Sequence, residues 1–585
     1  MTTFARDLPF GASLIAPDRT RFRLWAPGQQ RVAVAIEGQP AVDMVGDADG
    51  WFAVEVSCGA GARYRYRLQD GTAVPDPASR VQGSDVHDPS VVVDPRGYRW
   101  RHPEWRGRKW QETVLYEVHA GSLGGFAGIA AKLPELAALG ITAVELMPIN
   151  DFPGQRNWGY DGVLPYAPDT AYGTPDELKA LVDAAHGLGL MIFLDVVYNH
   201  FGPDGNYIGA YAPGFFRDDI HTPWGSAIDF RKTEVRRFFI ENALYWLMEY
   251  RFDGLRLDAV HAIAAPDWLD EMAAEVRATV EPGRQVHLVL EHDGNEAAHL
   301  RQGYDAQWND DAHHVLHVLL TGEGDGYYAD FADKPAERLA RCLAEGFIYQ
   351  GDESAYRKGE RRGTPSTDLP PTAFVMFLQN HDQVGNRPFG DRLLERVDPA
   401  AMAAAIALQL LCPHIPLIFM GEEGGSRTPF LYFTDHRDEL AQLVREGRRR
   451  EFAGFEGFRA GEKAESIPDP NHVLTFESSR PVADDADRRA LYRRLLTLRA
   501  AALSPHLAGA KTIFAKASGP ACVEARWRLG NGAVLVLLCN LGTAACAVER
   551  PAGDLLFESR AGASEDVRAG QLAGPATVAF LVPAG

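Results

Sequence analysis

The chain contains 585 residues, of which 46% are hydrophobic and 24% are charged. These fractions are average for globular proteins, so we expect no large disordered region, and the length predicts roughly two to four domains. The formal net charge of −20 disfavours a nucleic-acid partner, because proteins bind phosphate backbones through Lys and Arg side chains. An acidic surface leaves the binding of a neutral ligand unaffected.

Neither the N-terminus nor the most apolar stretch of the chain predicts a membrane segment. Met1–Asp18 lacks a charged region followed by a sustained apolar run, which a signal peptide would need. The window from 401 to 420 is interrupted by Pro413 and Pro416, and it predicts a core helix followed by a short buried strand. We therefore expect a soluble, cytoplasmic protein without a membrane partner.

The six cysteines are scattered without the paired spacing of a metal site or the pattern of a small disulfide-rich scaffold. We expect most of them to be buried small hydrophobic residues, which fits a reducing compartment. They are Cys58, Cys342, Cys412, Cys522, Cys539 and Cys546.

The first hundred residues alternate apolar and polar side chains, with Gly, Pro or Asp turns between the alternating runs. Examples are Phe22–Trp25, Val32–Ile36, Trp51–Val56 and Tyr64–Leu68. A period of two is typical of strands with one buried face, and short strands separated by turns favour an antiparallel sandwich. We predict an N-terminal β-sandwich over residues 1–98.

From about Val114 onward the pattern changes to strands that alternate with helices, which indicates a parallel sheet with crossover helices. Eight candidate strands within residues 99–480 predict a (β/α)8 barrel, so the fold class is α/β. The candidate strands are Val114–Val118, Ala143–Met147, Met191–Val197, Gly254–Leu257, His287–Leu290, Tyr304–Trp308, Ala373–Leu378 and Pro416–Met420.

Helix signals support the barrel. Between the second and third candidate strands, Thr174 can cap a helix, Pro175 occupies its first position and Glu177 completes a capping box. Residues 233–250 and 266–280 predict two further amphipathic helices.

Two regions depart from the barrel pattern. The long connection over residues 200–232 is rich in aromatic residues, Gly and Pro, and we expect it to be a loop that forms a wall over the site. Beyond a predicted helix at 487–503, short apolar runs such as 532–538 indicate strands. We predict an all-β C-terminal domain over residues 481–585.

Three acids follow apolar strand segments, where barrel enzymes keep their catalytic groups. Asp258, Glu291 and Asp382 come after the fourth, fifth and seventh candidate strands, so barrel closure would bring them together. Arg256 lies two residues before Asp258 and would hold it ionised, whereas desolvation would raise the pKa of Glu291. Each acid alone is explained equally well by an ion pair or a helix cap. The ordered set predicts a glycosidase site with a proton donor and an anionic carboxylate.

Further polar and aromatic side chains crowd the same predicted rim. Trp158 and Tyr160 are candidates for sugar stacking. Asp, Asn and His can also be metal ligands, but His313 and His317 lack the Glu of a zinc-protease helix. We expect no catalytic metal and no cofactor, and the sequence leaves open a structural calcium ion bound through Asn199. The polar rim residues, which we expect to hydrogen-bond a neutral sugar, are Asp195, Asn199, His200, His261 and His381.

The four segments that carry these residues resemble the signature regions of the α-amylase glycosidase family, in the same order. They are Asp195–His200, Gly254–Asp258, Leu288–Glu291 and Gln379–Asp382. The resemblance spans about residues 110 to 470. It implies a retaining enzyme in which Asp258 is the nucleophile, Glu291 the acid/base and Asp382 the transition-state stabiliser. It also implies an immunoglobulin-like fold for residues 21–94. The implied sugar-binding residues are Tyr160, His200, Arg256, His261, His381, Gln383 and Asn386.

A narrower resemblance connects the chain to the malto-oligosyltrehalose trehalohydrolase subfamily, through Phe152–Gly162, Tyr198–Tyr207 and above all Gly421–His436. It implies hydrolysis of the α-1,4 bond beside the terminal trehalose of malto-oligosyl trehalose. Gly424 and His292 depart from the subfamily pattern, which puts acceptor-side contacts in doubt. Specificity would lie on the leaving-group side. The candidates for a pocket on the leaving-group side are Asp310, Asp311, His313, His314, Arg427 and Phe430. The alternative is that these residues form a polar loop that stabilises the barrel rim.

Two other functions fit parts of the sequence. A glucan branching enzyme would share the N-terminal module and the four segments, but it would transfer the glycosyl unit to a sugar hydroxyl instead of water. A non-catalytic glucan-binding protein on the same fold would lack one or more acids, whereas Asp258, Glu291 and Asp382 are all present. We therefore expect an enzyme whose partners are malto-oligosyl trehalose and related α-glucans.

Overall fold

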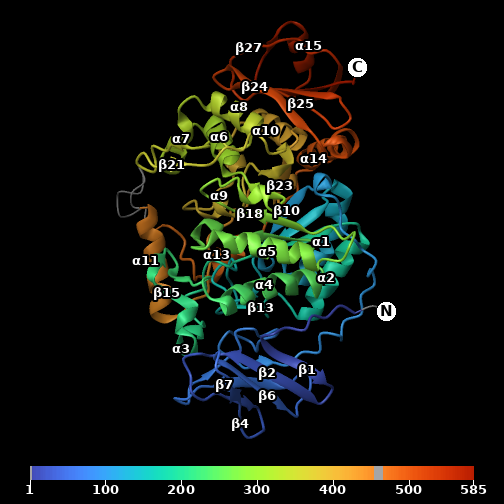
Figure 1. Cartoon of the computed structure of the whole chain (residues 1–585). Coiled ribbons are helices and arrows are strands. Elements are labelled where there is room, and N and C mark those ends of the chain that lie inside the picture. Colours follow the sequence, from blue (N-terminus) through green and yellow to red (C-terminus); the bar gives the residue numbers. More distant parts are fainter. Residues whose placement is uncertain (1–2, 453–465, 585) are drawn as a thin grey trace.

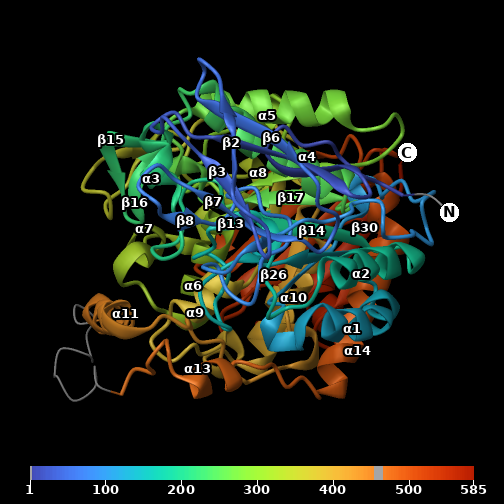
Figure 2. The same ribbon diagram turned by 90° about the horizontal axis from the view of Figure 1, so that it is seen from below.

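The computed structural model describes residues 3–452 and 466–584. It consists of three parts arranged end to end, with the N-terminal strands at one end, a barrel in the middle and the C-terminal strands at the other end (Figure 1). Seen from below, the N-terminal strands lie across the barrel (Figure 2). Residues 453–465, which fall within the predicted range of the barrel, lie outside the described residues.

The N-terminal part is a sandwich of two antiparallel sheets, which confirms the interpretation of the alternating pattern. Phe22 packs edge-on against Tyr64 of the opposite sheet at 4.8 Å between ring centroids, and both side chains are buried. One sheet comprises β1 (Gly11–Ala16), β2 (Arg19–Trp25), β6 (Trp51–Val56) and β5 (Val45–Gly46). The other comprises β4 (Val42–Asp43), β3 (Ala33–Ile36), β7 (Arg63–Arg67), β8 (Ala73–Val74) and β9 (Ser90–Val91).

The predicted barrel is confirmed, because eight parallel strands close into a ring. Its strands are buried throughout, since side chains fill the interior and helices cover the outside. The strands in order are β10 (Leu115–Val118), β11 (Ala143–Leu146), β14 (Met191–Val196), β17 (Gly254–Leu257), β18 (His287–Leu290), β19 (Ala306–Trp308), β22 (Phe374–Met376) and β23 (Ile415–Phe419). A short hairpin of β12 (Asn150–Asp151) and β13 (Leu164–Pro168) follows β11.

Helix α2 (Pro175–Gly187) begins with the predicted capping box, in which Glu177 N donates to Thr174 Oγ1 and Thr174 N donates to the Glu177 carboxylate. The predicted helix at 233–250 is α4 (Thr233–Met248), but it is buried on most sides rather than amphipathic. The reason is that the N-terminal sandwich also covers it, with Phe10 packed edge-on against Phe238. The other barrel helices are α1 (Gly125–Leu139), α5 (Pro266–Thr279), α6 (Asp310–Thr321), α7 (Ala329–Ala332), α8 (Pro335–Glu345), α9 (His381–Gly385) and α10 (Pro399–Leu411).

The most apolar window of the sequence is α10 followed by β23, as predicted. Within residues 3–452 and 466–584, no helix is long and apolar enough to cross a membrane.

The connection over residues 200–232 contains regular structure that the sequence analysis missed. It forms α3 (Ile208–Tyr211) and a hairpin of β15 (Phe216–Thr222) and β16 (Gly225–Ile228). Phe215 and Phe216 pack against Phe201, and Phe215 also packs against Phe238 of α4. The aromatic residues that marked this segment therefore anchor the hairpin to the barrel.

The C-terminal part is built on a five-stranded sheet, in agreement with the predicted all-β domain. The predicted helix at 487–503 is α14 (Ala486–Leu498) followed by a π-helical turn. The sheet comprises β24 (Lys511–Gly519), β25 (Cys522–Arg528), β26 (Val534–Asn540), β30 (Ala576–Val582) and β28 (Asp554–Glu558). The C-terminal part also contains α15 (Ala563–Arg568) and the paired β27 (Cys546–Ala547) and β29 (Gln571–Leu572), whereas α11 (Asp438–Phe452) and α13 (Val473–Glu477) precede it in the chain.

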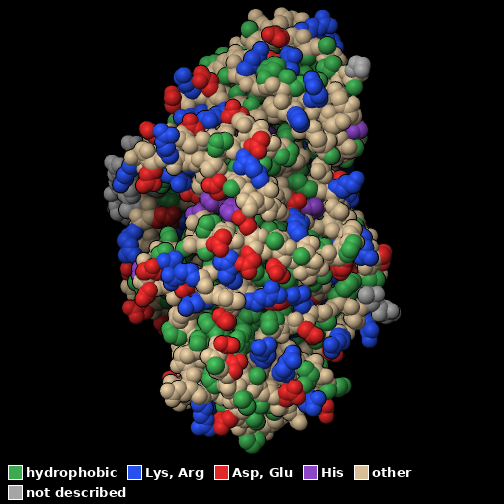
Figure 3. Space-filling model, in the orientation of Figure 1, with side chains coloured by type: hydrophobic (Ala, Val, Ile, Leu, Met, Phe, Trp, Pro, Cys, Tyr) green, Lys and Arg blue, Asp and Glu red, His purple; other side chains and the backbone are tan. Residues whose placement is uncertain are grey.

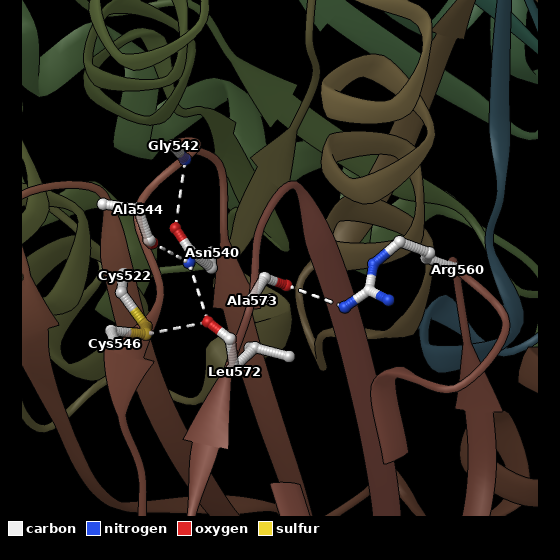
Figure 4. Close-up of a disulfide and its surroundings, with 8 residues drawn as sticks. All are labelled: Cys522, Asn540, Gly542, Ala544, Cys546, Arg560, Leu572 and Ala573. Carbon is white, nitrogen blue, oxygen red and sulfur yellow. Dashed lines mark hydrogen bonds between the residues drawn. A yellow bond between two sulfur atoms is a disulfide. The ribbon is translucent and has the colours of Figure 1, made fainter. Parts of the chain in front are cut away.

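The cysteine prediction was partly wrong. Cys522 of β25 and Cys546 of β27 form a disulfide (Figure 4). Their separation of 24 residues matches no motif, and the folding of the C-terminal part brings them together. A disulfide does not fit the predicted reducing compartment. The free and buried cysteines are Cys58, Cys342, Cys412 and Cys539.

We expect unfolded protein without reductant to present the four thiols of the free cysteines. Replacing both cysteines of the pair, Cys522→Ser with Cys546→Ser, should lower the free energy of unfolding of the C-terminal domain by about 3 kcal/mol, because the unfolded chain regains the freedom of the closed loop. Thiol titration in denaturant and urea unfolding measure these quantities. Six reactive thiols in unreduced protein would contradict the cross-link.

Candidate functional site

The acids predicted from separate segments lie at the same end of the barrel. Asp195 ends the apolar part of β14, Asp258 directly follows β17, and Glu291 directly follows β18. Asp382 lies in the first turn of α9, after β22. Parallel strands of a barrel all end at one rim, so these positions converge on the carboxyl ends of the strands.

A buried guanidinium joins three of these acids. Arg256 is on β17, opposite Asp195 of β14 in the strand register, and its side chain is 0% exposed. Its Nη1 lies 2.6 Å from Asp195 Oδ2 and 2.9 Å from Asp258 Oδ1. Its Nη2 lies 2.7 Å from Glu291 Oε2, and the group stacks on the Trp308 ring at 4.1 Å. Asp258 and Glu291 are therefore held by neighbouring nitrogens of one planar cation, a geometry that lysine does not offer.

The two acids next to this cation have different surroundings. Asp258 accepts a hydrogen bond from Asn199 Nδ2 at 2.8 Å in addition to the one from Arg256. Glu291 accepts the backbone N–H of Ala259 at 2.7 Å. Burial raises the pKa of Glu291, and the charge of Arg256 opposes this effect without cancelling it. Glu291 is therefore suited to donate a proton, and Asp258, which accepts hydrogen bonds from Arg256 and Asn199, is suited to the role of nucleophile.

The third acid lies beside a stack of two rings. Tyr160 and His381 are stacked with centroids 5.1 Å apart, and His381 Nε2 lies 3.4 Å from Asp382 Oδ1. Asp382 is 36% exposed and accepts a hydrogen bond from Asn386 Nδ2 at 3.1 Å. The hydroxyl of Tyr160 donates to Asp195 at 2.6 Å. Asp382 is thus the most accessible of the three predicted catalytic acids.

Asp195 was predicted to bind sugar, but its side chain is buried by Tyr160 and Arg256. Burial raises the pKa of Asp195 to about 7, although the charge of Arg256 lowers it. Asp195 therefore orients the tyrosine and the guanidinium from below and is not in position to contact a sugar directly.

The hairpin of residues 216–228 contributes an aromatic side chain to the site. Trp224 stacks on His200 at 4.8 Å between centroids and is 47% exposed. His200 Nε2 is 3.0 Å from the carbonyl oxygen of Tyr160, and burial lowers the pKa of the His200 ring. His261 is exposed at the rim, where its Nδ1 accepts the backbone N–H of Asp293 at 3.4 Å. Trp224 lies in the connection over residues 200–232 that was expected to form a wall over the site, but no pattern singled out this residue.

A cleft of about 370 Å³ opens beside Asp293, two residues after Glu291. Its walls include Asp293, His314, Tyr327, Tyr356, Arg357 and Arg362. Burial and, to a smaller degree, the charges of Asp382 and Asp310 raise the pKa of Tyr327, so this tyrosine lies close to the acids. Figure 3 shows histidine and acidic side chains gathered at mid-height, beside a hollow in the surface.

The tyrosines of this cleft were not predicted, because they come from segments without a strand or helix pattern. Tyr356, in a turn after β20 (Asp352–Glu353), is 55% exposed. Of the predicted leaving-group residues, one lines this cleft and another lies near Glu291. His314 is a wall residue, and Asp310 is close enough to Glu291 that burial and the Glu291 charge raise the pKa of Asp310 well above its usual value.

The prediction that Asp311 and His313 contact the sugar is wrong, because both side chains are buried and bonded within the protein. Asp311 accepts the backbone N–H groups of Ile348 and Tyr349 and two side-chain hydrogen bonds. His313 Nδ1 is 2.7 Å from the carbonyl oxygen of Leu378. These two residues stabilise the rim, which was the alternative interpretation.

Trp158 and Phe430 are also misassigned, since both are buried and stack on each other with centroids 5.3 Å apart. The indole N–H of Trp158 donates to the carbonyl of Leu431. Arg427 is 63% exposed and pairs with Glu395 at 2.8 Å, so it is outside the group of acids.

Three further residues that the sequence singled out are Gln383, Gly424 and His292. Gln383 accepts the backbone N–H of Asn380 and closes the capping box of α9, which orients Asp382. A Cβ atom on Gly424 would lie 2.6 Å from the Cβ of Ala483, so packing against Ala483 favours glycine there. His292 follows Glu291, and burial lowers the pKa of its ring to about 4.

Among the described residues, no group of three or more His, Cys, Asp or Glu side chains could hold a metal ion. The amide of Asn199 is engaged at both ends, since its Nδ2 donates to Asp258 and its Oδ1 contacts His200 Nδ1. Asn199, the residue through which a structural calcium ion was considered, therefore already has partners within the protein.

Comparison with known proteins agrees with this geometry. The family model for the α-amylase catalytic domain matches residues 82–211, and a model for a domain of unknown function matches residues 515–581. A malto-oligosyltrehalose trehalohydrolase of Deinococcus radiodurans is 42% identical over 507 residues, which are 85% of this chain and 82% of that protein.

Two further matches bear on the alternatives. The crystal structure of a Salmonella typhimurium protein assigned provisionally as an α-amylase is 44% identical, with a TM-score of 0.92, and the match covers 98% of this chain and 100% of that one. A 1,4-α-glucan branching enzyme of Jannaschia sp. is 35% identical, but the match covers 43% of this chain and 41% of that enzyme.

We expect Arg256→Lys to lower the free energy of unfolding of the barrel by about 3 kcal/mol, because one ammonium group leaves buried carboxylates without a partner. Turnover of the substrate by the Arg256→Lys variant should fall as well. Arg427→Lys, the same change at an exposed ion pair, is the control and should leave the urea midpoint unchanged. Equal midpoints for the two variants would show that an ammonium group can replace the buried guanidinium.

Proposed function

Because the chain belongs to the malto-oligosyltrehalose trehalohydrolases of the α-amylase family, we propose that it hydrolyses the α-1,4-glucosidic bond beside the terminal trehalose of malto-oligosyl trehalose and releases trehalose. The observation that carries this proposal is the match to trehalohydrolases over 85% of the chain. The geometry of Asp258, Glu291 and Asp382 around the barrel rim supports the glycosidic chemistry.

The proposed reaction has two steps. In the first, a carboxylate oxygen of Asp258 forms a bond to the anomeric carbon, the bond from that carbon to the trehalose oxygen breaks, and Glu291 donates its proton to that oxygen. In the second, Glu291 takes a proton from water, the water oxygen bonds to the anomeric carbon, and Asp258 leaves. Asp382 stabilises the positive charge on the ring. The placement of two acids on one guanidinium supports a short separation and hence retention.

Specificity for trehalose is proposed to come from the cleft on the Glu291 side, because the proton donor faces the leaving group. Its exposed aromatic rings, Tyr327 and Tyr356, suit the flat faces of two glucoses, and Asp293 and Arg357 offer partners for hydroxyl groups. A site that hydrogen-bonds particular hydroxyls discriminates strongly against a leaving group that lacks them.

The decisive experiment is digestion of maltoheptaose and of a maltosyl trehalose side by side, with product analysis. We expect free trehalose from the second substrate and slow hydrolysis of the first. The rival function, glucan branching, is favoured by the partial match to a branching enzyme. A fall in iodine staining of amylose without release of sugar would support branching and contradict the proposal.

A second experiment tests the role of Glu291. We expect Glu291→Gln to lower turnover of maltosyl trehalose on the order of 10²- to 10⁴-fold, because a positioned general acid contributes that much. Cleavage of the first bond in α-maltosyl fluoride should fall much less, since fluoride leaves without a proton. Burst kinetics with this substrate separate the two steps, and an equal loss for both leaving groups would assign the proton to another residue.

We also propose the domain ranges 1–98, 99–480 and 481–585 and a cytoplasmic location. The sandwich, the barrel and the C-terminal sheet support the ranges. A cytoplasmic location requires that the buried disulfide of Cys522 and Cys546 persists in a reducing environment, so the thiol count described above bears on this point as well.

A further inference from the structure

The barrel interior holds an acidic residue that the mechanism above does not use. Glu117, in the third position of β10, is buried, and its carboxylate lies against His381. Its Oε1 is 2.5 Å from His381 Nδ1, and its Oε2 accepts the backbone N–H of His381 at 3.1 Å. One carboxylate thus binds both the ring and the backbone of a residue that is 264 positions away in the sequence.

The remaining contacts leave the His381 ring a single orientation. Tyr160 covers one face of the ring, and Trp158 and Trp308 lie within about 6 Å at its sides, at centroid distances of 5.5 and 6.1 Å. With Nδ1 directed at Glu117, the other nitrogen, Nε2, points to the side of Asp382, 3.4 Å from its Oδ1. The hydrogen bond at one imidazole nitrogen determines which atom the other nitrogen presents.

We propose that Glu117 is a positioning residue for the glycosidase site, which orients the His381 ring and keeps it a cation, so that its Nε2–H is directed at Asp382 and at the adjacent sugar. The inference rests on the proposed function only for the presence of a sugar next to Asp382. The contact between Glu117 and His381 is a property of the unliganded protein.

The charges around the ring favour the cation. Burial lowers the pKa of His381, but the charges of Glu117 and Asp382 outweigh it and raise the pKa to about 9. A neutral ring would leave the Glu117 carboxylate buried without a counter-charge, which is costly. The titratable groups that face the ring from the surrounding elements are Glu117, His119, Glu145, Tyr160, Arg256 and Asp382.

The neighbouring acid, Glu145, does not compete for this role. It is paired with Glu117 in the register of β10 and β11, and both of its carboxyl oxygens are buried without a hydrogen-bond partner within the described chain. Burial and the charges of Glu117 and Asp195 raise the pKa of Glu145 well above its usual value, so its surroundings favour the neutral form. Glu117 and Glu145 therefore provide a matched pair, one bonded to His381 and one without a hydrogen-bond partner within the described chain.

The test compares Glu117→Gln, Glu117→Asp and the control Glu145→Gln, which replaces a neutral acid by a neutral amide. The substrate is α-maltosyl fluoride, because its glycosidic bond to fluoride breaks without the proton of Glu291. The alkaline limb of the pH profile of kcat/KM then reports the titration of another group. For the wild-type protein and for Glu145→Gln we expect this limb near pH 9. For Glu117→Gln the limb should move down by about 1–3 pH units, because the anion beside the ring is gone.

Glu117→Asp retains the charge and should keep the limb near its wild-type position with a lower kcat/KM. A Glu117→Gln protein whose limb coincides with that of the wild type overturns the proposal. If Glu117→Gln does not fold, the NMR titration of His381 in the unliganded wild-type protein decides, with the signal assigned by its loss in His381→Asn. A midpoint near 9 supports the proposal, and a neutral ring at pH 7.5 overturns it.

Because the fluoride is cleaved by any retaining site for α-glucosides, this result does not depend on which natural leaving group the enzyme accepts. Release of no trehalose in the digestion experiment, together with a shifted alkaline limb in Glu117→Gln, would reject the proposed substrate and keep the role of Glu117. The reverse pair of results would reject the role of Glu117 alone.

Discussion

The buried guanidinium of Arg256 is the interaction on which the site depends. It lies at the centre of the barrel's carboxyl end and contacts acids from three different strands. Without it, these carboxylates would repel one another in a region with little water, and burial would favour their neutral forms. One cation thus allows three acids to lie close together, while Asp258 and Glu291 have different roles in the reaction. The barrel makes this possible, because strands that are distant in sequence pair in register.

A second ion pair extends the same principle to the other side of the site. His381 and Glu117 are both buried, and each supplies the charge that the other requires. Glu145, which has no such partner, shows the contrast, because burial raises its pKa well above the usual value. The site therefore has an ionic half around Asp382 and a cleft with exposed tyrosines on the Glu291 side. This asymmetry matches a reaction in which charge develops on one sugar and the leaving group is a neutral disaccharide.

Sequence patterns predicted the parts of the molecule that depend on local order. The eight barrel strands, the capping box at Thr174 and the positions of Asp258, Glu291 and Asp382 follow from apolar runs and the residues next to them. Burial of Asp311 and the exposure of Tyr356 depend on how the segments after β19 fold back, and no short pattern records that. The pairing of Cys522 with Cys546 is of the same kind. Glu117 was not predicted, because a single acid within an apolar strand gives no periodic signal. The presence of an acid in such a strand was the available indication of a special role.

The most direct measurement is mass spectrometry of the protein after incubation with a slowly reacting 5-fluoro glycosyl fluoride, which accumulates the covalent intermediate of a retaining glycosidase. Peptide mapping then identifies the carboxylate that attacks the sugar. The account predicts a single glycosyl label on the peptide that contains Asp258, and none in Asp258→Asn. A label on another acid, or turnover without any covalent species, would contradict the arrangement of nucleophile and proton donor around Arg256.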